Sequence, residues 1–373
     1  MKWPWYSDEC RAAVDQLLRD GGGLSAYRSS PQHSVSPRED SWAYRLEALA
    51  ETLTGIHHAV ACNSGTMALM AGLRALQLRP QSRVVTSPYT FSATIASILH
   101  VNLRPVFGDV DPVTFTLDPS TAPVGELYMP VDLFGLRASR DFPGRVVADS
   151  CQAADPALTL SPALWATWSF NGHKNVPAGE AGMLLTNRDD LAERARLFIS
   201  HGENWREPAV GMNGRLNELT ACVAYFGLSE LGPRNAERRR MATNLWQDLQ
   251  NRYDPRIIPL AEDQIQHHAL YVYPFRVRTD VDRSAYVARL NAAGLTATEG
   301  YIIPPLHQYP AFRSYQVGPL PVVEGLSSRT LVLLPDLQPG YSMPTDKVAQ
   351  VLVEALDGTP SIELNPGGDV TWV

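Results

Sequence analysis

The chain lacks the features that would place it in a membrane or in an oxidising compartment. No stretch of 18 or more apolar residues occurs among its 373 residues, which argues against a transmembrane helix. Residues 1–7 have no apolar core and therefore do not resemble a signal peptide. Cysteine is scarce, and Cys10, Cys62, Cys151 and Cys222 are far apart and form no CxxC pair. We therefore expect four reduced thiols in a cytoplasmic protein, rather than disulfides or a zinc site.

An excess of positive charge is also missing. The chain has 39 acidic and 32 basic residues, which gives a net charge of −7. Nucleic-acid-binding proteins usually present a basic face, so we do not expect a nucleic-acid partner. The motifs GxxxxGK[ST], GxGxxG after a strand, and HExxH do not occur. Their absence argues against a nucleotide triphosphate, a dinucleotide or a metal ion as the cofactor.

The first two thirds of the chain alternate between apolar runs and amphipathic segments. Helices are predicted at 8–20 and 41–55, and a polar, Pro/Ser-rich loop at 24–40 joins them. Buried strands are predicted near 58–62, 83–87, 104–107, 127–131, 145–148, 165–170 and 182–186, and helices at 66–77, 91–100 and 189–199. Strands that alternate with helices predict an α/β layered fold with a mostly parallel sheet.

The composition changes after Gly232-Pro233. A helix is predicted at 215–231, and the Arg-rich run 238–240 opens a long helix beyond it. The elements predicted after these are a strand at 271–277, helices near 284–293 and 345–356, and an irregular tail at 358–373. Because chains of this length usually divide, we predict a large domain at 1–235 and a smaller α+β domain at 236–373.

Lys174 is the residue with the most suggestive surroundings. It follows the aromatic segment Trp168-Ser169-Phe170 and precedes the turn Gly179-Glu180-Ala181-Gly182, which predicts an interior-facing loop. A lysine in such a place can lose its proton and become the nucleophilic amine that a Schiff base requires. Most lysines are solvated surface charges, so this interpretation depends on the partners that the chain supplies.

The segment 63–66 is a candidate phosphate site. It follows a predicted strand and opens a helix, where backbone N–H groups are free to bind an anion. Ser64 and Thr66 add hydroxyl groups, and Gly65 lets the backbone approach closely. By itself the pattern also describes an ordinary helix N-cap.

Three further residues could contact a planar cofactor. Asp149 ends the run 145–149, so its carboxylate is predicted at the carboxyl edge of the sheet, where it could keep a ring nitrogen protonated. Gln152 offers an amide to a ring hydroxyl, and Phe91 could stack on the ring. Alone, Asp149 could equally be a cap or a salt-bridge partner, and Phe91 a core residue. The combination of a phosphate site, an aromatic ring that can stack, a carboxylate and a lysine predicts a pyridoxal phosphate site.

An ordered series of motifs connects the chain to one family. The segments are Asn63-Ser64-Gly65-Thr66-Met67-Ala68-Leu69, Tyr89-Thr90-Phe91-Ser92-Ala93-Thr94, Val106-Phe107-Gly108-Asp109-Val110-Asp111, Asp149-Ser150-Cys151-Gln152-Ala153, Ser169-Phe170, Lys174-Asn175, Gly179-Glu180-Ala181-Gly182, His201-Gly202, Gly211-Met212-Asn213-Gly214-Arg215-Leu216, Pro304-Pro305-Leu306-His307 and Pro310-Ala311-Phe312. In these segments the chain resembles the DegT/DnrJ/EryC1/StrS sugar aminotransferases, a branch of the fold-type I pyridoxal phosphate enzymes. The resemblance runs from about residue 5 to about residue 355.

The resemblance implies a role for each matching position. Lys174 would form the Schiff base and move protons, Asp149 would bind the pyridinium nitrogen, and Gln152 would face the ring hydroxyl. Phe91 would stack on the ring. The residues implied to hold the phosphate are Ser64, Gly65, Thr66 and Ser169, together with Asn213 of a neighbouring subunit. The resemblance therefore implies a homodimer with shared active sites.

The implied reaction is transfer of an amino group from an amino acid, with glutamate as the expected donor, to a keto-sugar nucleotide or a related cyclic ketone. Another reaction of the same cofactor, such as decarboxylation, dehydration or isomerisation, is the alternative, although retention of Lys174 favours transamination. A non-catalytic, cofactor-binding regulatory protein ranks below both. Tyr301 and His307 are candidate substrate contacts, although a surface or packing role would explain them equally well. The sequence does not identify the acceptor. Ala181 and Ser150-Cys151 depart from the family pattern, as does a short connection between the strands at 127–131 and 145–148.

Overall fold

A computed structural model describes residues 6–20, 23–27, 36–158, 163–202 and 210–361 of the chain. Parts of the predicted loop at 24–40 and most of the predicted tail at 358–373 therefore lie outside the described residues. None of the helices in the described part is long and apolar enough to cross a bilayer. The four cysteines are free thiols.

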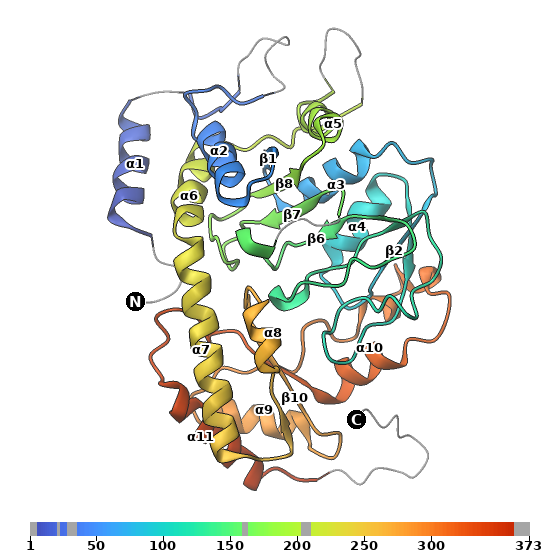
Figure 1. The fold of residues 1–373 in the computed structure, drawn as a ribbon, viewed down its shortest axis with the longest axis vertical. Coiled ribbons are helices and arrows are strands. Elements are labelled where there is room, and N and C mark those ends of the chain that lie inside the picture. Colours follow the sequence, from blue (N-terminus) through green and yellow to red (C-terminus); the bar gives the residue numbers. More distant parts are fainter. Residues whose placement is uncertain (1–5, 21–22, 28–35, 159–162, 203–209, 362–373) are drawn as a thin grey trace.

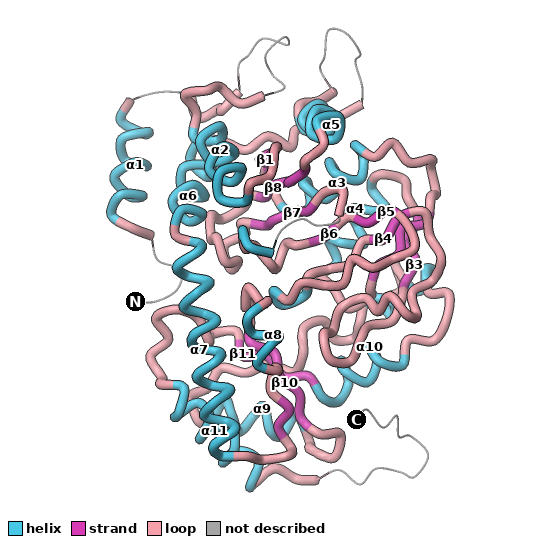
Figure 2. Tube along the Cα trace, in the orientation of Figure 1, coloured by secondary structure: helices cyan, strands magenta, loops and turns pink. Residues whose placement is uncertain are grey.

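The first two thirds of the chain form two four-stranded sheets that share one segment of backbone. The strand orders are β1-β8-β7-β6 and β3-β2-β4-β5. The strands are β1 His58–Cys62, β2 Arg83–Thr86, β3 Arg104–Phe107, β4 Leu127–Tyr128, β5 Arg145–Val146, β6 Ala148–Asp149, β7 Ala166–Ser169 and β8 Gly182–Thr186. Only Val147 separates β5 from β6, so the sheets meet there (Figure 2). Among the pairings of these strands, only those of β8 are antiparallel, which confirms the predicted mostly parallel α/β fold.

Helices cover both faces of the sheet that contains β8. The helices are α2 Trp42–Thr54, α3 Gly65–Ala75, α4 Ser92–His100, α5 Asp189–Ile199 and α6 Glu218–Ser229. Side chains of a strand alternate between faces. Leu184 of β8 therefore packs in the core that contains α3 and α5, whereas Met183 and Leu185 pack in the core that contains α2 and α6. The helix α1 (Asp8–Arg19) lies against α6 at the edge of the molecule and buries only Cys10 (Figure 1).

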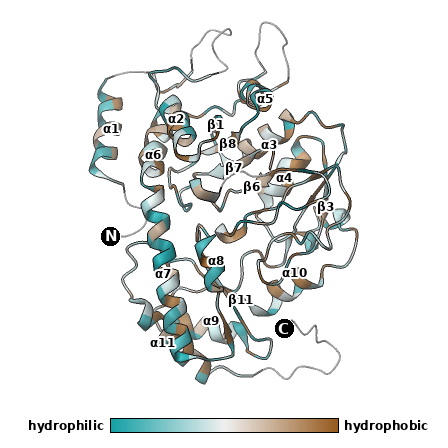
Figure 3. Ribbon diagram, in the orientation of Figure 1, coloured by the Kyte–Doolittle hydropathy of each residue, from teal (hydrophilic) through white to brown (hydrophobic). Residues whose placement is uncertain are grey.

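The last third of the chain packs around its own core. A three-stranded antiparallel sheet, in the order β11-β10-β9, packs with the long helix α7 (Leu231–Arg252). The remaining elements are β9 Ile257–Ile258, α8 Glu262–Gln266, β10 Tyr273–Val277, α9 Arg283–Ala292, α10 Pro321–Gly325, β11 Leu331–Leu334 and α11 Thr345–Asp357. Helix α7 is hydrophilic over much of its length (Figure 3). The predicted domain boundary near residue 235 falls inside α7, and the division at that point stays a prediction.

The structure corrects several predicted boundaries. The predicted strand at 127–131 is paired as β4 only to Tyr128, and β10 begins at Tyr273 rather than at residue 271. The reason in the second case is that the backbone N–H of Tyr271 bonds to the carbonyl of Phe134 rather than to a neighbouring strand (2.9 Å). Helix α7 already includes Pro233, because a proline in the first turn of a helix lacks only an N–H that would have no partner there. The strands β9 and β11 were not predicted.

Candidate active site

The predicted site residues that end β6 and β7 lie beside the start of α3. Asp149 is the last residue of β6, Ser169 is the last residue of β7, and Gly65 is the first residue of α3. Strands β6 and β7 are parallel neighbours, so their carboxyl ends meet at one edge. This is the edge at which open α/β sheets bind ligands.

The start of α3 is pressed against the ends of two strands. A Cβ atom added to Gly65 would lie 2.9 Å from Cβ of Ser169, and one added to Gly182 would lie 2.4 Å from the carbonyl carbon of Ser64. Ser64 caps the helix by accepting a hydrogen bond from the N–H of Met67 (3.1 Å). The N-cap described by the sequence is therefore present. The hydroxyl oxygen of Ser169 would lie 3.1 Å from the Cβ atom added to Gly65, so a hydroxyl group lies next to the N-terminus of α3. A helix N-terminus with a hydroxyl beside it suits a phosphate group.

Asp149 is a buried carboxylate without an ion-pair partner. It is 3% exposed and accepts hydrogen bonds from the hydroxyl of Thr94 (2.7 Å) and the N–H of Cys151 (3.2 Å). Among the residues that the structure describes, no cationic group lies within 4.0 Å of it. Burial raises the pKa of Asp149, and the hydrogen bond from Thr94 opposes the shift. Such a carboxylate fits a ligand that brings its own positive charge, such as a protonated ring nitrogen.

Lys174 is half-buried, and its ammonium nitrogen lies over the ring of Tyr271, 4.0 Å from the ring centroid. Burial lowers the pKa of Lys174, while the nearby Cys151 and Asp149 oppose the shift. The next residue, Asn175, anchors this loop because its side-chain amide donates to the carbonyl of Ala269 (2.8 Å). The position therefore favours a neutral amine more than an exposed lysine would.

Gln152 is engaged by two groups of the chain. Its Oε1 accepts from the N–H of Phe134 (2.8 Å), and its Nε2 donates to the hydroxyl of Tyr301 (3.0 Å). The ring of Tyr301 packs edge-on against that of Phe134, with 5.7 Å between centroids. The structure thus places Tyr301 beside a predicted site residue, whereas the implied contact of Gln152 with a ring hydroxyl stays a prediction.

Three predicted residues remain less tightly connected. Phe91 precedes α4 and is 54% exposed, which leaves its ring free to cover a ligand. Asn213 is exposed, and its carbonyl accepts a hydrogen bond from Asn63 (3.2 Å). Thr66 is half-buried in the first turn of α3. His307, a candidate substrate contact, is 2% exposed and bonds to Glu324 (3.1 Å), so its observed contact is internal.

Sequence reasoning missed two residues that contact the predicted site. Thr94 lies in a quoted motif and could have been found there, since it stands one helical turn after Phe91 and its hydroxyl reaches Asp149. Tyr271 was assigned to a strand, and no local pattern indicates its contact with Lys174. That contact arises because the segment around Ala269 pairs with Gly135 through a backbone hydrogen bond (2.8 Å).

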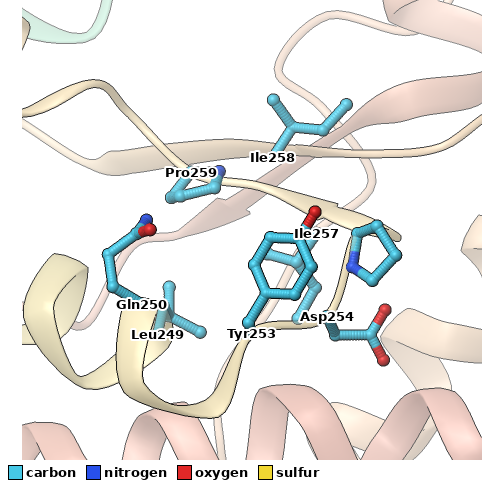
Figure 4. Close-up of a pocket in the computed structure, with 8 residues that line it drawn as sticks. Leu249, Gln250, Tyr253, Asp254, Ile257, Ile258 and Pro259 are labelled. Atoms are coloured by element: carbon cyan, nitrogen blue, oxygen red, sulfur yellow. The ribbon is translucent and has the colours of Figure 1, made fainter.

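A separate cavity of about 260 Å³ lies between the end of α7 and β9 (Figure 4). Its lining consists of Leu249, Gln250, Tyr253, Asp254, Pro255, Ile257, Ile258 and Pro259. The only carboxylate among them, Asp254, is paired with Arg256. The cavity therefore offers less for catalysis than the edge that contains Asp149 and Lys174.

Comparison with known proteins identifies the family of the chain. The profile of the DegT/DnrJ/EryC1/StrS aminotransferase family matches residues 40–138 and 145–355. The chain is 31% identical over 310 residues to UDP-N-acetyl-3-dehydro-alpha-D-glucosamine 3-aminotransferase of Acidithiobacillus ferrooxidans, covering 77% of this chain and 82% of that protein. It is 30% identical over 313 residues to a pleiotropic regulatory protein of Geobacillus stearothermophilus, covering 78% and 82%. The crystal structure of NtdA from Bacillus subtilis with bound cofactor PMP has a TM-score of 0.78 and 25% identity, covering 94% of this chain and 83% of that one.

Proposed function

We propose that this chain, which belongs to the DegT/DnrJ/EryC1/StrS aminotransferase family, moves an amino group from glutamate to a keto-sugar nucleotide. The chain is a pyridoxal-phosphate-dependent aminotransferase of fold type I. The observation that carries the site assignment is the buried Asp149, which has no ion-pair partner among the described residues and lies near the buried amine of Lys174. A carboxylate of this kind is suited to hold a cationic ring nitrogen.

The residues at the sheet edge fit pyridoxal phosphate. When bound, this cofactor supplies an electron-withdrawing ring that stabilises negative charge on the carbon next to an amine. In the proposal, the phosphate is held by Ser64, Gly65, Thr66 and Ser169. Asp149 keeps the ring nitrogen protonated, Phe91 covers one face of the ring, and Gln152 faces the ring hydroxyl.

Lys174 holds the cofactor covalently through Nζ in the resting enzyme and acts as the base once it is released. Its lowered pKa increases the fraction of neutral amine near neutral pH, which is the form that accepts a proton. With the cofactor bound, Nζ of Lys174 would take the proton from the α-carbon of the amino acid, hold it as an ammonium group and release it again on the cofactor side. The loop bond from Asn175 to the carbonyl of Ala269 fixes the lysine while it acts.

The proposed acceptor rests on a relative. The Acidithiobacillus protein is named for an amino transfer to an oxidised UDP-N-acetyl-glucosamine, and this supports a keto-sugar nucleotide for the present chain. A cyclic ketone without a nucleotide is the broader version of the same proposal. A different reaction at the α-carbon is the alternative. A non-catalytic role is a third hypothesis, because one relative is named as a regulatory protein.

We also propose that two subunits share each site. The side chain of Asn213 is exposed in the single chain, and its position matches the asparagine that the family resemblance implies for a neighbouring phosphate. The measurement is the mass of the purified protein in solution, combined with mixing of Lys174→Ala and Asn213→Ala subunits. Recovery of activity in the mixture supports shared sites, whereas no recovery contradicts them. The cytoplasmic location stays a prediction.

The first experiment concerns the cofactor and the donor. We expect the purified protein to bind pyridoxal phosphate with a visible absorbance band that Lys174→Ala loses. In a separate sample, borohydride should remove the band and link the cofactor covalently to Lys174. Glutamate should then bleach the band and release one 2-oxoglutarate for each site. A colourless wild-type protein after reconstitution would contradict every enzymatic version of the proposal.

The second experiment concerns the acceptor. After the glutamate half-reaction, the protein is offered a panel of keto-sugar nucleotides, keto-sugar phosphates and cyclic ketones, and return of the band is followed. Return with a nucleotide-linked ketone supports the proposal. A loaded enzyme that loses its band with glutamate but regains it with no ketone of the panel would move the assignment to another reaction.

A further inference from the structure

The amine of Lys174 must be held near the reacting atoms when it is not bonded to the cofactor. During each cycle of a transaminase the amino acid replaces the lysine, and the freed Nζ has to stay close enough to move a proton. In the structure Nζ lies 4.0 Å from the centroid of the Tyr271 ring. Aromatic rings attract an ammonium group at this distance because their faces carry partial negative charge.

Tyr271 is held firmly in this place. Its N–H donates to the carbonyl of Phe134 (2.9 Å), and its own carbonyl accepts from the side-chain amide of Gln338 (2.6 Å). Gln338 in turn accepts a hydrogen bond from the buried Arg238 (2.7 Å). Two residues earlier, Ala269 bonds to Asn175 beside the lysine. The ring therefore lies on backbone that is fixed both to the large sheet region and to the C-terminal region.

The groups that face Nζ come from several elements. Asp149 and Cys151 lie at and after the end of β6, and both favour the charged amine, whereas burial opposes it. Tyr271 contributes its ring face, and Tyr301 lies close enough to Tyr271 to interact with it electrostatically. Among these groups, the ring of Tyr271 is in direct contact with the amine nitrogen in the described part of the structure.

We propose that Tyr271 is a positioning residue. Its ring binds Nζ of Lys174 whenever this nitrogen is not bonded to the cofactor. The inference rests on the proposed role of Lys174. The ring keeps the free amine at one place and stabilises its ammonium form, so that it returns a proton as readily as it takes one. The interaction belongs to the ring face, so the hydroxyl group of Tyr271 is not required.

The test is the pH dependence of cofactor capture by the cofactor-free protein. Capture of pyridoxal phosphate needs the neutral amine, so its rate rises with pH through the pKa of Lys174. Tyr271→Leu removes the ring that favours the ammonium form, and we expect the midpoint to fall by about 0.5 to 1 pH unit. Tyr271→Phe keeps the ring and should match the wild type. Tyr253→Leu, the same change at a tyrosine that is 73% exposed, is the control.

A second variant distinguishes the loss of the ring interaction from a folding defect in Tyr271→Leu. Pentafluorophenylalanine at position 271 keeps the shape of the ring but reverses the charge of its face, so it should lower the midpoint as leucine does. An unchanged midpoint in both variants would overturn the inference, and so would a shift in Tyr271→Phe equal to that in Tyr271→Leu. Failure of the wild type to capture the cofactor at Lys174 would instead overturn the proposed function, so the two failures can be told apart.

Discussion

Two buried carboxylates lie close together where the two four-stranded sheets meet, and their partners differ: Asp132 comes shortly after β4, and Asp149 ends β6. Asp132 is 2% exposed and receives both an ion pair from Arg140 (2.8 Å) and a hydrogen bond from the hydroxyl of Ser150 (2.5 Å). Asp149 is 3% exposed, and within the described part of the chain its carboxylate receives hydrogen bonds from Thr94 and Cys151 but no ion pair. The two are adjacent, since the N–H of Asp132 donates to the carbonyl of Asp149 (2.9 Å).

The difference suits Asp132 to a structural role and Asp149 to the ligand-binding role that we propose for it. A buried charge costs several kcal/mol unless it is paired and hydrogen-bonded. Asp132 meets this requirement inside the chain, so it needs nothing further. Asp149 has no such ion pair among the described residues, and burial raises its pKa although Thr94, Cys151 and the nearby Lys174 oppose the shift. The same residue type at the same depth therefore serves two purposes, and the following predictions test that division.

The largest effect is expected when the structural pair is broken. Arg140→Met leaves Asp132 buried without its cation, which should lower the free energy of unfolding by about 3–5 kcal/mol. Chemical denaturation of the cofactor-free protein measures the loss. Arg145→Met, at an exposed arginine of β5, is the matched control and should change stability little. A loss below 1 kcal/mol in Arg140→Met would contradict the structural role.

The reverse behaviour is expected at the second carboxylate. Asp149→Asn should reduce turnover by roughly 10²–10³-fold, because the ring nitrogen loses the charge that keeps it protonated. The free energy of unfolding of the cofactor-free protein should stay equal or rise, since a buried charge without a cation has been removed. Turnover with glutamate and the denaturation midpoint are the two measurements. Asp141→Asn, at an exposed neighbour, is the control.

Because the pKa of Asp149 is raised in the folded state, the free energy of unfolding of the cofactor-free protein should depend on pH. A group whose pKa is higher in the folded state stabilises the fold below its unfolded value, near 3.8, and this contribution is lost as pH rises through the folded value. The advantage of Asp149→Asn over the wild type should therefore grow with pH across this window and then level off. Denaturation curves from pH 3.5 to 8 would show this, and a constant difference between the two proteins would refute it.

The smallest effect is expected from the hydroxyl that supports Asp149. Thr94→Val removes the hydrogen bond to Oδ2, so cofactor affinity should fall by about tenfold, equal to roughly 1.4 kcal/mol. Equilibrium titration with pyridoxal phosphate measures this change. Thr52→Val, which removes a hydroxyl bonded to a backbone carbonyl on α2, should leave the affinity unchanged. Equal affinities in Thr94→Val and the wild type would mean that Asp149 does not need this support.

Much of the fold could be predicted because its signals are local. Apolar runs and helix periodicity located β1, β3, β8 and α5 to the residue, since each has a buried apolar side and clear limits. Lys174 and Asp149 were found because a nucleophile after an aromatic strand, and an acid at a strand end, have recognisable neighbours in the sequence. Their predicted chemical roles await the experiments above.

Other features depend on contacts between distant segments and have no local signal. The pair Asp132–Arg140 requires the chain between β4 and β5 to fold back through a 3-10 turn at Leu133–Gly135. Tyr271 contacts Lys174 from a segment whose backbone bonds to Phe134 and Gly135, far earlier in the chain. A pattern of one segment cannot specify such a meeting. The predicted strand at 271–277 was placed two residues too early for the same reason.

The contrast between Gly182 and its neighbour Ala181 has a consequence for anyone who diversifies this enzyme in the laboratory. Ala181 is 1% exposed and packs in the core, so the methyl group that departs from the family pattern is accommodated. Gly182 faces the backbone at Ser64 and Gly65, where no atom can be added without moving the start of α3. In a randomised library, position 181 should return several small residues, whereas position 182 should return glycine alone. Libraries aimed at new substrates should therefore leave position 182 unchanged.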